Sequence, residues 1–302
     1  MTGRRSQSQG GTDACGATRP RRPLALCSIS ALDRPLAAAA SLAAAQGLDG
    51  LEITARPPHL DASAPDAVIR EAGRAVREAG VAVTAYGSYL GQGAGPRNPG
   101  AGAPPVRGVA AAVREARIAA LLGAPLLRVW ADCIASAPDA GFAEVVATLR
   151  AACDAAADAG VTVVVERHVG SFADTPERID ALLEAVARPN LALNYQVLDG
   201  LPQRLAAQQP EDARRLVARA RYFHLKNTRP AADGAGPMPP GGSLASGVLD
   251  YRAILAAAFA AGYAGPLTIE FLSFEPRPVE DKLAEDVAWL RGVLAELGAG
   301  GG

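Results

Sequence analysis

The sequence predicts a single (β/α)8 barrel. Along residues 24–297, short apolar runs alternate with Ala-rich stretches of helical pattern, and eight such units favour closure into a barrel over an open sheet. The run 161–165 is apolar at four of its five positions, as expected of a parallel strand buried on both faces. A doubly wound open sheet is the main alternative, but no G-x-G-x-x-G motif follows the first apolar run.

The predicted elements follow one another at regular spacing. Thr175-Pro176-Glu177 has the pattern of a capped helix start, and Gly47 and Gly80 are two of the glycines that mark helix ends. We expect strands at 24–29, 51–54, 81–86, 126–130, 161–166, 191–195, 222–225 and 267–271. We expect helices at 34–46, 65–79, 106–122, 139–159, 176–187, 211–220, 250–262 and 279–297.

Several segments are expected to lie outside the regular elements. Residues 1–23 hold five arginines and no apolar stretch, so they predict a disordered tail and not a signal peptide, and the Gly-rich end 298–302 predicts a second flexible tail. The long Gly/Pro-rich segments 87–105 and 227–246 both follow a strand. In a barrel such loops lie on the catalytic face.

Composition and charge argue against a protein that binds nucleic acid or a membrane surface. A net charge of −1 and 5% aromatic residues give no drive toward nucleic acid or a membrane surface. The four cysteines, Cys15, Cys27, Cys133 and Cys153, form no C-x-x-C pair and indicate reduced thiols of a cytoplasmic protein. A small-molecule partner is therefore expected, and assembly into a homo-oligomer stays open.

Polar residues at the ends of the later predicted strands are the candidate functional residues. Glu166, Gln196, His224 and Glu270 close or follow otherwise apolar runs, and barrel active sites form at the carboxyl ends of strands. Taken singly, such a Glu is more often solvated or ion-paired, and such a His is more often a satisfied core residue. Their joint occurrence at successive strands predicts one divalent-metal site, with Mn²⁺ favoured and Mg²⁺, Co²⁺ or Zn²⁺ as alternatives.

The segments GLDGLEIT, VVVERH, LALNY, YFHLKN and LTIEF resemble the xylose-isomerase-like barrel superfamily of sugar and sugar-phosphate isomerases and epimerases. The resemblance covers about residues 24–297. It implies that Glu166, Gln196, His224 and Glu270 are the metal ligands. Gln196 departs from the family pattern, which usually has Asp there, and its neutral amide oxygen is a weaker ligand for a hard cation. Asp199 in the following loop is a candidate substitute.

The resemblance also implies a reaction and roles for individual residues. Glu166 and Glu270 would move a proton next to a keto-sugar carbonyl through an enediolate, with His168 polarising a substrate oxygen or serving only as a loop residue. His59, Trp130 and Lys226 are candidate substrate-binding residues, each with a structural alternative. We expect a structural role for Glu52 and an ionic supporting role for Arg128.

Other functions use the same site. A lyase or dehydratase, or a deglycosidase acting on an oxidised sugar or inositol, would remove the same proton and then expel a leaving group. A non-catalytic ligand-binding barrel is compatible with Gln196. No phosphate-binding Gly-rich loop is evident, so the sequence alone favours an unphosphorylated sugar or glycoside.

Overall fold

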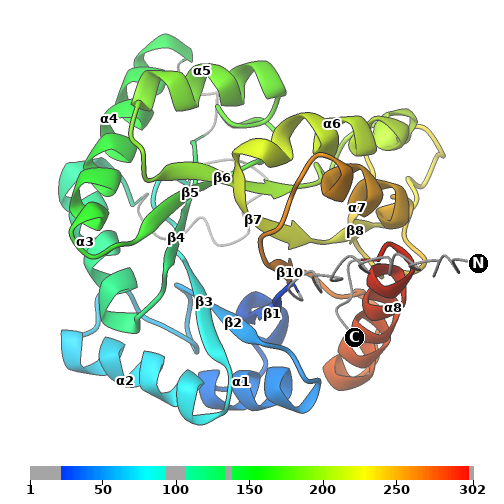
Figure 1. The fold of residues 1–302 in the computed structure, drawn as a ribbon, viewed down its shortest axis with the longest axis horizontal. Helices are drawn as coiled ribbons and strands as arrows, with labels where there is room; N and C mark the ends of the chain where they lie inside the picture. Colours follow the sequence, from blue (N-terminus) through cyan, green and yellow to red (C-terminus); the bar gives the residue numbers. More distant parts are fainter. Residues whose placement is uncertain (1–21, 93–105, 133–137, 299–302) are drawn as a thin grey trace, which may run out of the picture.

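The computed structural model describes residues 22–92, 106–132 and 138–298 and confirms the predicted (β/α)8 barrel. The closed ring has the strand order β1-β10-β7-β6-β5-β4-β3-β2, and every neighbouring pair is parallel (Figure 1). The strands are β1 (Leu24–Cys27), β2 (Gly50–Thr54), β3 (Ala82–Gly87), β4 (Leu126–Val129), β5 (Thr162–Glu166), β6 (Leu191–Gln196), β7 (Ala220–Leu225) and β10 (Leu267–Ile269).

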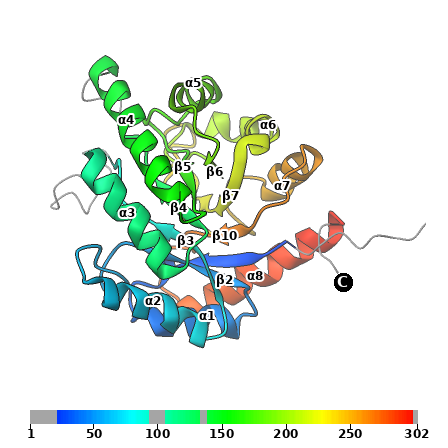
Figure 2. The same ribbon diagram turned by 60° about the vertical axis from the view of Figure 1, so that its left-hand side comes forward.

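An outer layer of helices covers the ring, as Figures 1 and 2 show. The helix starts follow local chemistry: the Thr175 side chain accepts a hydrogen bond from the Arg178 amide, and Asp250 accepts one from the Ala253 amide. The helices are α1 (Leu36–Ala45), α2 (Asp66–Glu78), α3 (Gly108–Leu122), α4 (Pro138–Ala157), α5 (Pro176–Val186), α6 (Gln209–Leu216), α7 (Tyr251–Ala260) and α8 (Val279–Glu296). Among the described helices, none combines the length and apolar character that a membrane crossing requires.

The structure differs from the prediction mainly in the loops. The segment 227–246 contains a short antiparallel ribbon of β8 (Asn227–Thr228) and β9 (Pro240–Gly242), which its Gly/Pro content concealed. The sixth helix begins two residues before the predicted 211 and ends in a 3-10 turn at Val217–Arg219. Residues 1–21, 93–105, 133–137 and 299–302 lie outside the described residues, as do Cys15 and Cys133 within them.

The interior of the barrel has two layers. A buried apolar cluster, called the apolar plug below, lies beneath a layer of polar strand-end residues. Ala85, Val164, Ala192 and Tyr222 form a buried cluster that the side chains of the ring enclose. Successive strand residues alternate between faces, so residues two positions further along point to the same side. Glu166 follows Val164 at this spacing, and His224 follows Tyr222. The polar strand ends therefore lie above the plug, at the carboxyl end of the barrel.

Asp286 is a buried acid that joins α8 to the loop before α7. It is 1% exposed, and its Oδ1 accepts a hydrogen bond from the Leu244 amide at 2.9 Å. Its Oδ2 has no hydrogen-bond partner among the described residues. Burial raises the pKa of Asp286 from 3.8 to about 7, while the Leu244 amide acts in the opposite direction.

This shift predicts a pH-dependent stability. The folded chain binds the Asp286 proton more tightly than the unfolded chain does, so its contribution is fully present below about pH 4 and is lost as the pH rises to about 7. The loss is about 4 kcal/mol at most, from roughly three pKa units. Asp286→Asn should therefore gain stability relative to the wild type as the pH rises from 4 to 7, measured by urea unfolding. Glu184→Gln, an exposed position on α5, is the control, and equal pH slopes for wild type and Asp286→Asn would contradict the prediction.

Candidate metal centre

Three predicted residues meet inside the mouth of the barrel. Glu166 ends β5, His224 lies within β7, and Glu270 directly follows β10. Each offers a ligand atom within 4.8 Å of the others, and all three are buried. The His224 Nδ1 atom lies 3.5 Å from Glu270 Oε1 and 4.0 Å from Glu166 Oε2. The parallel ring brings together side chains that are between 46 and 104 positions apart in the sequence.

Glu52 fixes the orientation of the His224 ring. The His224 Nε2 atom donates a hydrogen bond to Glu52 Oε2 at 2.6 Å, and both side chains are fully buried. This contact turns Nδ1, the other ring nitrogen, toward Glu166 and Glu270. Burial lowers the pKa of His224, but the carboxylates of Glu52 and Glu270 outweigh it and raise the pKa to about 10. A carboxylate on one ring nitrogen with the second nitrogen free for a metal is a common arrangement of metal-binding histidines.

Arg128 compensates two of the carboxylates. Its Nε atom lies 3.4 Å from Glu52 Oε1 and 3.1 Å from Glu166 Oε2, and its side chain is 2% exposed. Gly87, at the end of β3, leaves room for this pair, because an added Cβ would lie 2.5 Å from Glu52 Oε1. The expected ionic role of Arg128 is thus seen as two buried ion pairs. Through its contacts with Arg128 and His224, Glu52 is also a member of this buried cluster.

Lys226 is the second buried cation of the cluster. Its Nζ atom lies 3.3 Å from Glu270 Oε2 and 3.4 Å from Asp199 Oδ2. Burial raises the pKa of Glu270, but Lys226 and His224 outweigh this effect and hold the pKa well below its usual range, so Glu270 is ionised. Asp199 therefore pairs with Lys226 and lies outside the group of three potential ligands.

The cluster contains more carboxylates than cationic side chains, so a divalent cation could neutralise the excess negative charge. Among the described residues, the carboxylates of Glu52, Glu166, Glu270 and Asp199 lie within ion-pair distance of the two cations Arg128 and Lys226. A metal binds only the neutral form of an imidazole, so a bound ion would displace the proton that the carboxylates hold on His224. The remaining side chains then carry two uncompensated negative charges in a buried site, which a divalent cation would neutralise. The donor set of two carboxylates and an imidazole nitrogen suits Mn²⁺, Mg²⁺, Co²⁺ or Zn²⁺. The residues present thus fit a divalent metal.

Two amides border the triad. Gln196, the last residue of β6, donates from Nε2 to Glu166 Oε1 at 2.9 Å and to the Arg167 carbonyl at 2.7 Å. Its Oε1 atom has no hydrogen-bond partner in the described part of the chain. Asn194 Nδ2 lies 3.2 Å from His224 Nδ1, and Asn194 Oδ1 also has no partner there. The two unpartnered amide oxygens are thus buried acceptors beside the triad.

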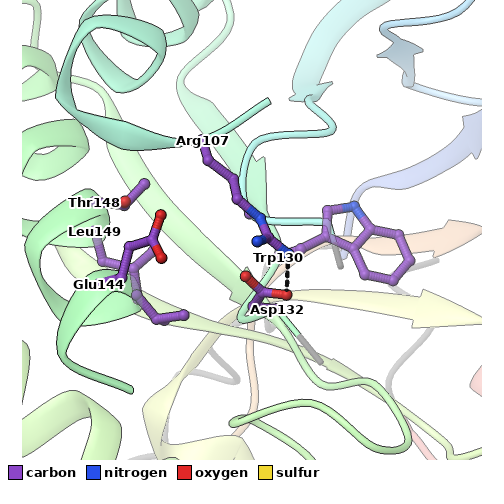
Figure 3. A pocket seen from close by; sticks show the side chains of 8 residues that line it. Arg107, Trp130, Asp132, Glu144, Thr148 and Leu149 are labelled. Carbon is purple, nitrogen blue, oxygen red and sulfur yellow. Dashed lines mark hydrogen bonds and ion pairs between the residues drawn. The ribbon is translucent and has the colours of Figure 1, made fainter. Parts of the chain in front are cut away.

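The other predicted residues lie around this cluster. The Trp130 and His168 rings pack with centroids 4.7 Å apart and planes tilted by 54°, and the Arg128 guanidinium lies 5.5 Å from the Trp130 ring. Figure 3 shows the Trp130 indole pointing away from the Arg107–Asp132 ion pair, which joins the segment before α3 to the end of β4. Trp130 and His168 thus form an aromatic wall beside Arg128.

His59 has a different environment. Its Nε2 atom lies 3.1 Å from the Ala31 carbonyl and 3.0 Å from the Arg34 carbonyl. Burial lowers the pKa of His59, although these two carbonyls act in the opposite direction. A neutral ring that donates to two backbone carbonyls holds the loop after β2, and within the described ranges no hydrogen bond or ion pair joins it to the triad. Its predicted role in substrate binding stays a prediction.

The sequence pattern underestimates Glu52 and conceals Asn194. Both lie inside apolar strands, in GLEIT and LALNY, where they alternate with residues that face the helices. Counting back two positions from a strand-end polar residue identifies such side chains, because that spacing keeps the same face. Asn194 precedes Gln196 by this interval.

The fold and this buried cluster define a (β/α)8 barrel with a candidate metal centre at the carboxyl ends of its strands. A family model described as the xylose isomerase-like TIM barrel matches residues 40–293, so the chain belongs to that family. No curated protein sequence matches it significantly.

Several solved structures share the fold. One is a D-allulose 3-epimerase from Methylomonas sp., with a TM-score of 0.65, 19% identity and coverage of 92% of this chain and 100% of that one. Another is a xylose isomerase-like barrel from Mycobacterium smegmatis in complex with magnesium, with a TM-score of 0.65, 18% identity and coverage of 91% and 97%. A probable 3-DHS dehydratase from Bacillus anthracis has a TM-score of 0.63, 18% identity and coverage of 89% and 98%. At these identities the likeness shows the fold alone.

The position of Arg128 predicts its contribution to stability. Arg128→Met leaves Glu52 and Glu166 buried with less compensation, so we expect a loss of about 3–5 kcal/mol in the free energy of unfolding. The control Arg74→Met removes two ion pairs, to Glu71 and Glu78, on the surface of α2, where the arginine is 57% exposed, and should change stability by less than about 1 kcal/mol. Adding Glu166→Gln to Arg128→Met should restore part of the loss. Similar small effects for both single variants in urea unfolding would show that the buried pairs contribute little.

Proposed function

We propose that the protein is a divalent-metal-dependent isomerase or epimerase of a keto-sugar. The observation that carries this proposal is the convergence of Glu166, His224 and Glu270, with ligand atoms within 4.8 Å, at the carboxyl ends of the strands of a xylose isomerase-like barrel. The family membership and the fold shared with a D-allulose 3-epimerase support it.

The metal would be held by Glu166, His224 and Glu270, with the amide oxygen of Gln196 as a fourth ligand. Mn²⁺ is favoured because two carboxylates, an imidazole and an amide form a mixed oxygen and nitrogen set. When bound, a divalent ion supplies Lewis-acid polarisation of a substrate carbonyl, which makes the neighbouring C–H more acidic.

The side chains of the protein itself would move the proton. Glu270 is held ionised by Lys226 and His224, so it is available as a base. Glu166 reaches the site from β5 and Glu270 from β10, on separate parts of the ring. One carboxylate would remove the proton next to the carbonyl and the other would return one, with an enediolate between the two steps.

Neighbouring groups would bind and orient the substrate. The Lys226 ammonium, already beside Glu270, would stabilise negative charge that develops on a substrate oxygen. Trp130 would offer an apolar surface to the sugar ring or chain, and His168, which packs against it at a tilt, would polarise a substrate hydroxyl or carbonyl.

A lyase or dehydratase is the second candidate, since it begins with the same proton removal. The fold that this chain shares with a probable 3-DHS dehydratase supports this second candidate. The two reactions differ in their second step, because elimination expels a β-substituent whereas isomerisation returns the proton.

Metal content is the first test. Wild type, Glu270→Gln and the exposed control Glu78→Gln, purified without chelator, should be compared by mass spectrometry after incubation with Mn²⁺. We expect about one ion per chain in the wild type and control and at least tenfold weaker retention in Glu270→Gln. If the wild type holds no metal, the proposed function fails, and a non-catalytic ligand-binding barrel becomes the better interpretation.

Reaction type is tested on the metal-loaded enzyme with a panel of keto-sugars in D₂O. Isomerisation or epimerisation should place deuterium at the carbon next to the carbonyl, with no loss of a substituent. A product lighter by one water molecule would establish the dehydratase instead. Glu166→Gln should lower the rate at least 100-fold if this carboxylate handles the proton.

Replacing Gln196 by Asp should raise the affinity for metal and lower the stability of the metal-free protein. Gln196→Asp adds a third anionic ligand, so the affinity for Mn²⁺ should rise at least tenfold. The same change removes the two hydrogen bonds that Gln196 Nε2 donates and places an anion beside Glu166, so the metal-free protein should melt at a lower temperature. Calorimetric titration and thermal melts with and without Mn²⁺ measure both effects. A larger metal-induced stabilisation than in the wild type is expected, whereas an unchanged one would place residue 196 outside the metal centre.

A further inference from the structure

A hollow of about 380 Å³ is lined by residues that closely follow the proposed active-site residues Lys226 and Glu270 in the chain. It is formed by the segment after β7, including the β8–β9 ribbon, and by the segment after β10. These are the seventh and eighth strands of the barrel in chain order, and the loops after them form the phosphate-binding site of many barrels of this architecture.

The hollow carries positive charge that no carboxylate balances. Arg229 and Lys282 both line it, and neither has a carboxylate within ion-pair distance in the part of the chain that the structure describes. Arg229 uses only its Nε atom, which donates to the Pro240 carbonyl at 3.2 Å, so both terminal guanidinium nitrogens stay available. Lys282 Nζ donates to the carbonyls of Ser273 and Glu275, which leaves its third hydrogen free.

The remaining charged residues of the hollow compensate one another. Arg277 lies 2.8 Å from Glu285 and 3.9 Å from Glu275. A bound anion would therefore meet the two cations Arg229 and Lys282, while Arg277 stays paired. A phosphate monoester carries up to two negative charges near neutral pH and matches this pair, and Arg offers two parallel donors to such a group.

Small residues supply the rest of the wall. Ser243, Ser246 and Ser273 also line the hollow. The Ser243 and Ser246 hydroxyls bond each other at 2.8 Å, which uses one of their two protons, and Ser273 Oγ accepts from the Glu275 amide. Two hydroxyl protons are therefore left for anionic oxygens. Gly241 has a φ of +88°, and an added Cβ would lie 2.3 Å from the Phe274 ring. An added Cβ at Gly242 would lie 2.4 Å from the Thr228 carbonyl oxygen. These two glycines let the ribbon pack closely against its neighbours and keep the hollow open.

The chain itself ties this hollow to the catalytic groups. Thr228 follows Lys226 by two residues, and Ser273 follows Glu270 by three. A fully extended chain spans at most ~3.6 Å per residue, so the Cα atoms of Ser273 and Glu270 are no more than ~11 Å apart. This upper limit is compatible with a sugar chain of five or six carbons that has its carbonyl at one end and a phosphate at the other.

We propose that this hollow binds the terminal phosphate of the substrate, so that the substrate class is a keto-sugar phosphate and not the unphosphorylated sugar that the sequence alone favours. This inference rests on the proposed function for the identity of the sugar, but the phosphate site itself can be tested without turnover.

The first experiment titrates inorganic phosphate into metal-free protein at low ionic strength, followed by calorimetry. Metal-free protein is used so that an ion in the catalytic centre does not bind the phosphate. We expect saturable binding to the wild type that is weaker by about 10- to 100-fold in Arg229→Ala and in Lys282→Gln. Arg214→Ala, an exposed arginine on α6 that is paired with Glu211, is the control of equal charge change and should bind as the wild type does. Arg229→Ala is the decisive variant because Lys282 also holds the backbone after β10.

The second experiment compares matched keto-sugars with and without a terminal phosphate on the metal-loaded enzyme. We expect the phosphorylated member to have the lower KM, and Arg229→Ala to raise that KM at least tenfold with little change in kcat. Turnover of free keto-sugars without phosphate binding or phosphate preference would overturn the phosphate site and leave the proposed function standing. Phosphate binding that depends on Arg229, with no turnover of any keto-sugar, would overturn the proposed function and leave the phosphate site standing. Equal phosphate binding by wild type and Arg229→Ala would also overturn the site.

Discussion

The Arg128 guanidinium inserts between the carboxylates of Glu52 and Glu166, and a chain of contacts extends from it across the barrel interior. Glu52 binds His224, and His224 Nδ1 faces Glu270. Charges in such an interior are tolerated only when each has its partner in place, so no member of the chain can move alone. The closed ring of strands and the apolar plug beneath it keep these distances short.

This interdependence gives the site its preorganisation. Each group is contributed by a different strand, and each rotamer is fixed by a charged or hydrogen-bonding neighbour and not by packing alone. The cluster lacks two positive charges once His224 gives up its proton, so a divalent cation that binds the neutral ring would complete it. The loops after β7 and β10 lie next to the same two strands that supply Lys226 and Glu270. Chemistry and substrate selection are thus divided between strand ends and loops.

The fold could be predicted well from the sequence because alternation of strands and helices is a repeated signal. Glu166, His224 and Glu270 could also be singled out, since each is a polar residue at the end of an apolar strand. The contact between Glu52 and His224 could not be anticipated, because it joins residues 172 positions apart and depends on the register of the ring. The β8–β9 ribbon was concealed for a related reason: its strands are two and three residues long and rich in Gly and Pro.

The pairing of β1 with β10 closes the ring and also constrains how the protein is made. β1 lies between β2 and β10, and its pairs Leu24–Leu267 and Leu26–Ile269 join the two ends of the chain. During synthesis, one edge of β1 stays unpaired until β10 has left the ribosome. An unpaired apolar strand edge is prone to association with other chains. Production of this barrel therefore depends on protecting its first strand until its last one emerges.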